Sequence, residues 1–417
     1  MAVSVIEKYL SRYSEPETQD LSLPGNYEHC LVIPATQESA DSLRSVWQDI
    51  PSSTSLLVIV VINAKDHENQ SEAALLNNLL ASGPSVSPKP GMFLVSQATG
   101  PDLLLIDRYS ENRLIDSRQG VGLARKIGAD IALKLWQTGY LASPWLRNTD
   151  ADAILPANYF THGHADATAL LYPFRHVPAI TTETAKPDQI ATSLYDLSLL
   201  YYPAGLSRAG SPYAFPTIGS TLCCRLEAYA QVRGFPRRNA AEDFYLLNKL
   251  RKVGAVLAID CPPITLSGRR STRVPVGTGQ AIASIAELPH ALQDYQFEHP
   301  QCFEKLRELL LHLEEFSRNA DPTIFQRDRT LKEYSEVSGL DVHIQKLAKE
   351  QSRPAVRQKS LMDWFDALRT RQFIHHVRDR QYGTLPLLDL ARHFNVGKAP
   401  NKSIQLLRKQ CARVIYQ

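Results

Sequence analysis

The chain has 417 residues, with 46 Lys and Arg against 43 Asp and Glu, so its formal net charge at pH 7 is +3. This balance gives no electrostatic reason to expect a polyanionic partner, and no nucleic acid is expected. The length suits one large domain with an extension, or two domains. Every apolar run is far shorter than the roughly 20 residues that span a bilayer, so no transmembrane segment is expected.

The cysteines indicate the cellular compartment. The six cysteines show no Cys-x-x-Cys spacing, and Cys223 and Cys224 are adjacent in an apolar stretch. Buried thiols are therefore expected rather than a disulfide framework or a zinc site. The first residues show no basic start followed by an apolar core. Together these features predict a cytoplasmic protein, either free or peripheral to a membrane.

Apolar runs alternate with amphipathic stretches through the first part of the chain. The expected strands lie near 30–35, 56–63, 92–96, 103–107, 144–149 and 167–174. The expected helices lie near 38–49, 70–82 and 120–137. This alternation is typical of a parallel α/β sheet, in which ligands bind beyond the carboxyl ends of the strands. Beyond about residue 285, apolar residues recur at helical spacing, which predicts a helical C-terminal region.

A carboxylate pair, Asp150 and Asp152, follows the fifth expected strand. On an extended backbone, residues two apart point the same way, and two adjacent carboxylates repel each other unless a cation lies between them. Hard oxygen ligands suit Mg²⁺ or Mn²⁺, which usually completes its shell with substrate phosphates. The pair therefore predicts a metal site for a nucleotide-diphosphate substrate. Without its neighbours, however, the pattern is more typical of a solvated turn.

The helix expected from Gly120 to about Gln137 begins with small residues and two cations. Small residues such as Gly122 permit close packing or the close approach of a ligand. Arg125 and Lys126 add positive charge where the helix dipole is already positive, which is unfavourable unless an anion binds there.

Four segments, in this order, resemble the motifs of family-2 glycosyltransferases, which have the GT-A fold. Val32-Ile-Pro-Ala-Thr-Gln-Glu38 is similar to the first-strand motif of that family, and the segment 120–128 is similar to its Gly-x-x-x-Ala-Arg-Asn-x-Gly helix. Thr149-Asp-Ala-Asp152 matches its metal motif, and the segment 234–247 resembles its Gly-Phe followed by Glu-Asp on a helix. The resemblance covers about two-thirds of the chain.

The resemblance implies an α/β fold of GT-A type, a Rossmann-like mixed sheet flanked by helices. The GT-A-like domain is expected at 1–285, with a donor half at about 28–155 and an acceptor half at about 156–285. Residues 286–417 are expected to form a helical C-terminal domain or extension, which the resemblance does not cover.

The resemblance also implies the donor, the metal and the residues that bind them. The donor is a nucleotide-diphospho-sugar, and Asp150 and Asp152 are expected to hold Mg²⁺ or Mn²⁺. No histidine is assigned as a third ligand. The second strand ends in Ile62-Asn63-Ala64, where the family usually has an Asp-Asp-Gly-Ser type sequence, so the contact to the base falls at Asn63. With the three arginines that are proposed below from their chemistry, the expected donor-binding residues are Pro34, Ala35, Thr36, Glu38, Asn63, Gly122, Arg125, Asp150, Arg269, Arg270 and Arg273.

Glu242 and Asp243 lie at an expected helix start, with Asn239 as the expected N-cap. Carboxylates in a first turn stabilise the helix dipole without any further function. In the family, however, this position holds the general base. The resemblance thus implies an inverting transfer in which Asp243 takes the acceptor proton and Glu242 orients the acceptor or caps the helix.

Arg269, Arg270 and Arg273 lie in a glycine-containing segment without apolar periodicity. Guanidinium groups suit phosphate oxygens, and glycines let backbone amides approach them. The segment is either a mobile loop that closes over the donor diphosphate or binds an anionic acceptor, or a solvated basic loop.

Two other functions are compatible with such a fold. A nucleotidyltransferase that makes nucleotide-sugars would carry a glycine-rich basic loop after the first strand, and Pro34-Ala-Thr-Gln-Glu38 has neither glycine nor lysine. A catalytically silent binding module would lack one of the motif carboxylates, and all four are present. The acceptor stays open between a glycan, a lipid-linked molecule and a small molecule, as does the oligomeric state.

Overall fold

A computed structural model describes residues 4–64, 70–178, 186–271, 277–350, 353–397 and 399–416. The chain forms two compact units. The first comprises Met1–Thr192 and Thr217–Ala283, and the second comprises Ser193–Pro216 and Ser284–Gln417. The expected division into 1–285, with its donor and acceptor halves, and 286–417 stays a prediction.

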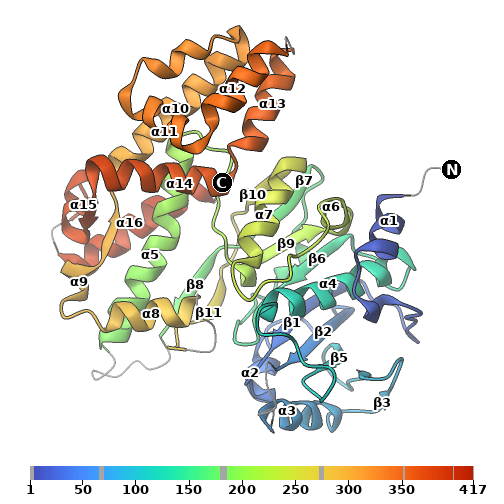
Figure 1. Ribbon diagram of the computed structural model, residues 1–417. Helices are drawn as coiled ribbons and strands as arrows, with labels where there is room; N and C mark the ends of the chain where they lie inside the picture. The colour runs from blue at the N-terminus through green and yellow to red at the C-terminus, as the bar shows by residue number, and fades with distance from the viewer. Residues whose placement is uncertain are drawn as a thin grey trace. The chain divides into compact units, whose positions relative to one another are not determined.

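The first unit is built on a nine-stranded sheet within the described residues (Figure 1). In sheet order, its strands are β10 (Ala255–Ala258), β7 (Ala167–Leu171), β9 (Leu222–Arg225), β6 (Trp145–Asn148), β1 (His29–Ala35), β2 (Leu56–Asn63), β5 (Asp102–Arg108), β4 (Met92–Val95) and β3 (Ser85–Val86). A separate parallel pair joins β8 (Phe174–Val177) to β11 (Ile264–Ser267).

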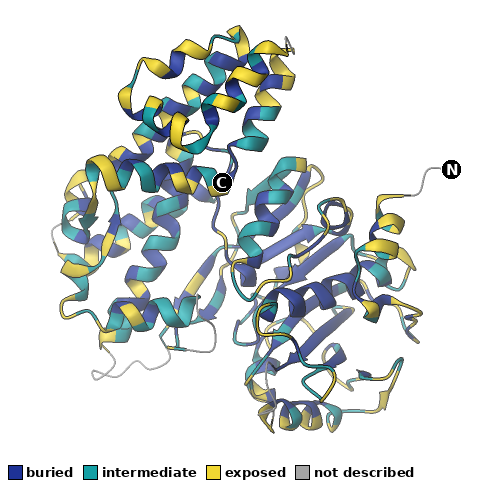
Figure 2. Ribbon diagram, in the orientation of Figure 1, coloured by how far each residue is buried: buried dark blue, intermediate teal, exposed yellow. Residues whose placement is uncertain are grey.

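The centre of the sheet is parallel and its flanks are antiparallel. Strands β6, β1, β2 and β5 run parallel, whereas β9 is antiparallel to both β6 and β7, and β4 is antiparallel to both β3 and β5. Every residue of β2 is buried, as expected of a central strand covered on both faces. Figure 2 shows the strands of this sheet as largely buried. The structure thus confirms a large mixed sheet flanked by helices, with a helical C-terminal region.

The helices of the first unit include α1 (Val5–Arg12), α2 (Ala40–Ser45), α3 (Gln70–Leu80), α4 (Gly120–Gln137), α6 (Leu226–Gln231) and α7 (Glu242–Val253). Helices α3, α4, α6 and α7 pack against strands of this sheet, and α1 packs against α4 and α6. Helix α4 packs against β1, β2 and β6. A Cβ atom at Gly128 would lie 2.3 Å from a methyl carbon of Val32, so glycine there lets α4 approach β1 closely.

The second unit is largely helical. It contains α9 (Ala291–Asp294), α10 (Pro300–Asn319), α11 (Arg329–Ser338), α12 (Leu340–Lys349), α13 (Pro354–Trp364), α14 (Ala367–Val377), α15 (Leu387–His393) and α16 (Pro400–Ile415), with a hairpin of β12 (Gln296–Glu298) and β13 (Thr384–Pro386). Two helices cross from one unit to the other, namely α5 (Lys186–Arg208) and α8 (Thr278–Ala286). Short helices of other types lie at Pro16–Thr18, Tyr159–Thr161, Gly219–Thr221, Pro322–Gln326 and Arg378–Tyr382. Among the described residues, no helix is both long and apolar enough to span a bilayer.

Candidate active site

The carboxyl ends of the parallel strands meet at one edge of the sheet, and most of the expected site residues lie there. Because β1, β2 and β6 are parallel, Glu38 and Asp150 follow strand ends at this edge, and Asn63 is the last residue of β2 there. Strand β9 is antiparallel to β6, so the residues before its start, including Ser220, also lie at this edge.

Asp150 and Asp152 lie in a turn rather than on an extended strand. Strand β6 ends at Asn148, and the main-chain N–H of Ala153 donates to the carbonyl of Asp150 at 3.2 Å. The expectation that the pair shares one side of a strand is therefore wrong in its geometry. Each carboxylate nevertheless contacts a guanidinium, Asp150 that of Arg125 at 2.5 Å and Asp152 that of Arg269 at 3.0 Å. Burial lowers the pKa of Arg269, but Glu38, Asp152 and Asp150 together outweigh it and raise that pKa.

Arg125 joins the two acidic pairs of the site. Its Nη2 donates to Asp150 at 2.5 Å and its Nε donates to Glu242 at 2.9 Å, and its side chain is 4% exposed. A Cβ atom at Gly219 would lie 2.7 Å from Nη2 of Arg125, so glycine at that position makes room for the guanidinium. The anion expected beside the first turn of α4 is thus supplied by the protein's own carboxylates. Direct binding of a donor phosphate by Arg125 stays a prediction.

The acidic pair begins α7, but Asn239 does not cap this helix. The N-cap is Ala241, at φ 60°, and it provides no side-chain capping hydrogen bond; within the first turn, the main-chain N–H of Phe244 donates to Asp243 at 2.6 Å. Asn239 instead packs against Gly120, where an added Cβ would lie 2.8 Å from the Cα of Asn239. Tertiary packing of the loop on α4 therefore overrides the local capping preference.

Glu242 and Asp243, the two members of the acidic pair, have different surroundings. Glu242 is buried and paired with Arg125. Burial, followed by the nearby Glu242 carboxylate, raises the pKa of Asp243 to about 7. A carboxylate with this pKa can accept a proton near neutral pH.

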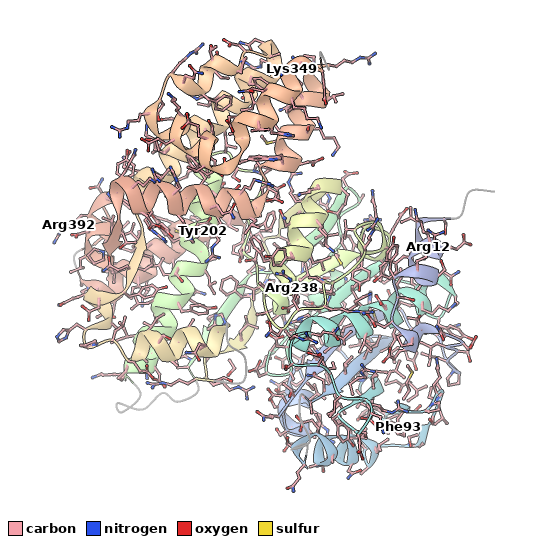
Figure 3. All side chains as sticks on the ribbon, viewed as in Figure 1. Arg12, Phe93, Tyr202, Arg238, Lys349 and Arg392 are labelled. Atoms are coloured by element: carbon pink, nitrogen blue, oxygen red, sulfur yellow. The ribbon has the colours of Figure 1, made fainter. Side chains whose placement is uncertain are left out.

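Gly122 contacts backbone rather than open space. Its N–H donates to the carbonyl of Arg238 at 2.8 Å, and an added Cβ would lie 2.5 Å from the carbonyl oxygen of Pro236. Arg238, labelled in Figure 3, belongs to the loop between α6 and α7 that leads to Glu242. Close packing of this loop accounts for the glycine, as one of its two expected roles, and a contact of Gly122 with a donor stays a prediction.

The expected donor-binding residues at the end of β1 and just after it include some that contact other residues of the protein. Pro34 and Ala35 are part of β1, and Ala35 is buried. The hydroxyl of Thr36 donates to Glu72 at 3.2 Å. Glu38 pairs with Arg269. Asn63, at the end of β2, is buried, and a contact of any of these residues with a donor stays a prediction.

The three arginines of the glycine-containing segment separate in the structure. Arg269 contacts Glu38 and Asp152, at the strand-end edge. Arg270 instead pairs with Asp188 of α5. Arg273 lies outside the described residues. Of the two arginines that the structure describes, Arg269 and not Arg270 is therefore placed beside Asp152.

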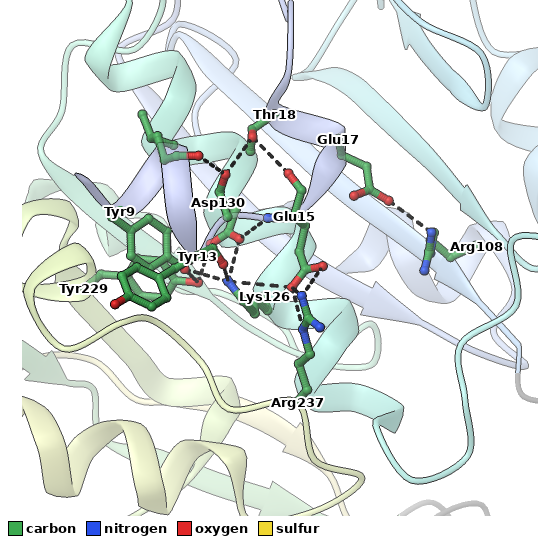
Figure 4. A network of polar contacts seen from close by, with 12 residues as sticks. Tyr9, Tyr13, Glu15, Glu17, Thr18, Arg108, Lys126, Asp130, Tyr229 and Arg237 are labelled. Carbon is green, nitrogen blue, oxygen red and sulfur yellow. Dashed lines mark hydrogen bonds and ion pairs between the residues drawn. The ribbon is translucent and has the colours of Figure 1, made fainter. Parts of the chain in front are cut away.

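Lys126 belongs to a second, buried polar network (Figure 4). Its Nζ donates to the hydroxyl of Tyr9 and to Asp130, each at 2.7 Å. Asp130 also accepts from the main-chain N–H of Glu15 at 2.8 Å. Glu15 forms a bidentate pair with Arg237 at 2.9 and 3.0 Å. The network thereby ties the N-terminal segment to α4 and to the loop that precedes the acidic pair.

The donor atoms of Asp150 and Asp152 fit a divalent cation. Both side chains are partly exposed, and carboxylate oxygens are the ligands that Mg²⁺ and Mn²⁺ prefer. Among the described residues, there is no group of three or more His, Cys, Asp or Glu side chains arranged to hold a metal. Such a cation would take its other ligands from substrate phosphates and water, as Mg²⁺ commonly does.

Sequence reasoning missed two residues that complete the site. The hydroxyl of Ser220 donates to Asp150, and Glu72 of α3 accepts from Thr36 and from the main-chain N–H of Gln37 at 2.8 Å. The only signal for Ser220 was a Gly-Ser-Thr run before an apolar strand. Glu72 carried no signal, because its role depends on where α3 packs.

Comparison with known proteins gives weak likenesses. No protein-family model matches the chain, and no curated protein matches it. One similar solved structure is S. aureus TarS 1–349 in complex with UDP-GlcNAc, at 12% identity and TM-score 0.36, covering 85% of this chain and 93% of that chain. Another is the mannosyltransferase PcManGT from Pyrobaculum calidifontis in complex with GDP-Man and Mn²⁺, at 15% identity and TM-score 0.36, covering 91% and 92%. At such low TM-scores, these likenesses do not establish a family or a function.

Proposed function

We propose that this protein is a glycosyltransferase. It would transfer a sugar from a nucleotide-diphospho-sugar to an acceptor hydroxyl, with inversion of configuration and with Mg²⁺ or Mn²⁺. The observation that carries the proposal is the position of Arg125, whose guanidinium contacts Asp150 on one side and Glu242 on the other. The buried guanidinium of Arg125 thereby joins Asp150, one of the two candidate metal ligands, to Glu242, the neighbour of the candidate base Asp243.

On the donor side, Asp150 and Asp152 would hold the cation. When bound, the cation would offset the charge that develops on the leaving diphosphate. Arg125 and the Ser220 hydroxyl both contact Asp150, so they fix the orientation of this carboxylate before a donor binds.

On the acceptor side, the two carboxylates have different tasks. Glu242 is held by Arg125, and its charge is compensated. Asp243 has a pKa raised to about 7, by burial and then by Glu242. Asp243 is therefore the better general base, since it can take the proton of an acceptor hydroxyl near neutral pH. Glu242 would keep Asp243 and the start of α7 in place.

The first test is donor binding by thermal shift. UDP- and GDP-sugars are added to the wild type with and without Mn²⁺, and a bound donor should raise the Tm by mass action. Asp152→Asn should abolish the Mn²⁺-dependent shift, whereas Asp41→Asn, an exposed residue of α2, should not. An equal shift in Asp152→Asn and the wild type would remove the pair from the donor site.

The second test is turnover. Released nucleoside diphosphate, rather than pyrophosphate, distinguishes glycosyl transfer from nucleotidyl transfer. Mixed oligosaccharide, lipid-linked and small-hydroxyl acceptors serve as probes. Asp243→Asn should lower turnover about 10²–10⁴-fold, the usual contribution of a positioned base, with donor affinity within a few-fold of the wild type. Retention of configuration in the product, or near-normal turnover in the variant, would overturn the assignment of the base.

A further inference from the structure

Arg269 lies at the carboxylate where the cation is proposed to bind. Its Nη2 is 3.0 Å from Oδ2 of Asp152, and the same nitrogen contacts Glu38. A positive side chain thus pairs with Asp152. A guanidinium and a divalent cation repel each other strongly at contact distance, so both are not expected on one carboxylate oxygen.

The two arginines of the site differ in how firmly they are held. Arg125 is 4% exposed, lies on α4 and has carboxylate partners from two other elements. Arg269 is 33% exposed and lies in a short irregular stretch after β11. A partly exposed ion pair is weak enough for another cation to replace it. Arg125 is therefore a fixed part of the site, whereas Arg269 can be displaced.

Glu38 provides a second anchor for Arg269. Its side chain is buried, and it follows β1 at the same edge of the sheet as Asp152. A guanidinium that leaves Asp152 while keeping its contact with Glu38 stays beside the site. It then remains available to an anionic group that arrives with the cation.

We infer that Arg269 and the divalent cation compete for Asp152. In the absence of donor, Arg269 compensates the charge of Asp152. Binding of the cation with a nucleoside diphosphate displaces the guanidinium, which then pairs with the diphosphate. The inference rests on the proposed function, and it adds an exchange of charge that couples metal binding to donor binding.

The test measures Mn²⁺ alone, without nucleotide, from the electron paramagnetic resonance signal of the free ion. Arg269→Ala should bind Mn²⁺ at least about fivefold more tightly than the wild type, the lower end of ordinary coupling between two sites. Arg269→Gln, which keeps a hydrogen-bond donor but no charge, should do the same. Arg44→Ala removes a surface arginine that pairs with Asp41 at 3.2 Å, and it should leave the affinity unchanged.

The increase in Mn²⁺ affinity that Arg269→Ala causes should depend on the Asp152 carboxylate. In Asp152→Asn, adding Arg269→Ala should bring no tighter binding of Mn²⁺. The opposite sign is expected with nucleotide, where Arg269→Ala should bind UDP or GDP more weakly at saturating Mn²⁺. Equal Mn²⁺ affinity in the wild type and both Arg269 variants, or no Mn²⁺ binding by any of these proteins, would overturn the inference.

Failure of the proposed function would look different. In that case, no UDP- or GDP-sugar would shift the Tm of the wild type at any Mn²⁺ concentration, even with tighter Mn²⁺ binding in Arg269→Ala. Conversely, a donor could bind equally well with and without a chelator of divalent cations. That result would support a donor site but would overturn the proposed competition between Arg269 and the cation for Asp152.

Discussion

Nε of Arg125 donates to Oε1 of Glu242 at 2.9 Å, although the two residues are 117 positions apart in the chain. Both side chains are almost fully buried. The same guanidinium also contacts Asp150. A buried cation between two acidic groups links the edge of the sheet that carries Asp150 to the start of α7.

Removal of the Arg125 guanidinium should lower the free energy of unfolding. Arg125→Ala leaves Glu242 buried without a counter-charge, and breaking a buried pair from one side typically costs about 3–5 kcal/mol. Because Asp150 remains partly exposed, we expect a loss near the low end of that range, about 3 kcal/mol, from urea unfolding. Arg118→Ala, which removes an exposed partner of Asp116, should leave the midpoint unchanged. Arg125→Met combined with Glu242→Gln should recover part of the loss, since position 242 is then neutral and needs no counter-charge.

The raised pKa of Asp243 should appear in the pH dependence of stability. The folded protein holds this proton up to about pH 7, whereas the ordinary value is 3.8. Between these two values, the folded state binds more protons than the unfolded state, so the free energy of unfolding should fall as pH rises and then level off above about 7. Urea unfolding at several pH values should show this decline in the wild type and a flatter profile in Asp243→Asn. Identical profiles would show that Asp243 ionises normally in the fold.

The same titration should control turnover. A base must be ionised to accept a proton, so transferase activity should rise with pH through about 7, the pKa to which burial and Glu242 raise Asp243. The pH profile of kcat/KM reports the free enzyme and is the measurement of choice. Glu242→Gln removes the neighbouring charge and should move the rise to lower pH. A rise at unchanged pH in Glu242→Gln would assign the titration to another group.

The network around Asp130 predicts a specific effect of one hydroxyl. Tyr9 donates to Asp130 at 2.6 Å, and Asp130 is completely buried. Tyr9→Phe keeps the ring but removes a hydrogen bond to a charged group, so it should lower the free energy of unfolding by about 2 kcal/mol. Tyr13 takes part through its main-chain carbonyl, which accepts from Lys126 at 2.8 Å. Tyr13→Phe is therefore the matched control, and losses of equal size would contradict the network.

Gly122 should not tolerate a side chain. Gly122→Ala would place a methyl group 2.4 Å from the carbonyl oxygen of Arg238, so the loop before the acidic pair would have to move. Overpacking of this kind costs about 1–3 kcal/mol. At Gly25, the nearest atom to an added Cβ is the hydroxyl oxygen of Tyr27 at 3.8 Å, and Gly25→Ala should be nearly neutral in the same unfolding measurement. A neutral Gly122→Ala would mean that the loop is free to shift.

Local patterns predicted several elements well. The expected strand 56–63 and the expected helix from Gly120 to about Gln137 coincide with β2 and α4. Both could be predicted because a continuous apolar run and a helical period are patterns among residues close together in the sequence. The expected strand 167–174 instead divides into β7 and β8. The interruption at Pro173 fits the difference, since proline has no N–H to give to a strand neighbour.

Local preferences predicted part of the site. The positive end of the α4 dipole beside Arg125 predicted a neighbouring anion, and the structure provides two carboxylates, those of Asp150 and Glu242. The capping rule predicted Asn239 as the N-cap of α7, and packing of that residue against Gly120 prevented it. Local preferences are worth about 1 kcal/mol, and tertiary packing overrides them.

The sequence by itself determined the central parallel strands β1, β2, β5 and β6 and the position of Asp150 beyond the end of β6. This follows because burial patterns are local and because parallel strands bring their carboxyl ends to one edge. Only the tertiary structure decided that Arg125 joins Asp150 to Glu242, and that Arg269 rather than Arg270 reaches Asp152. Such pairs depend on how α4, α7 and the stretch after β11 pack on the sheet. Charge alone cannot choose among many possible partners, because the choice is made by burial and close packing of groups far apart in the chain.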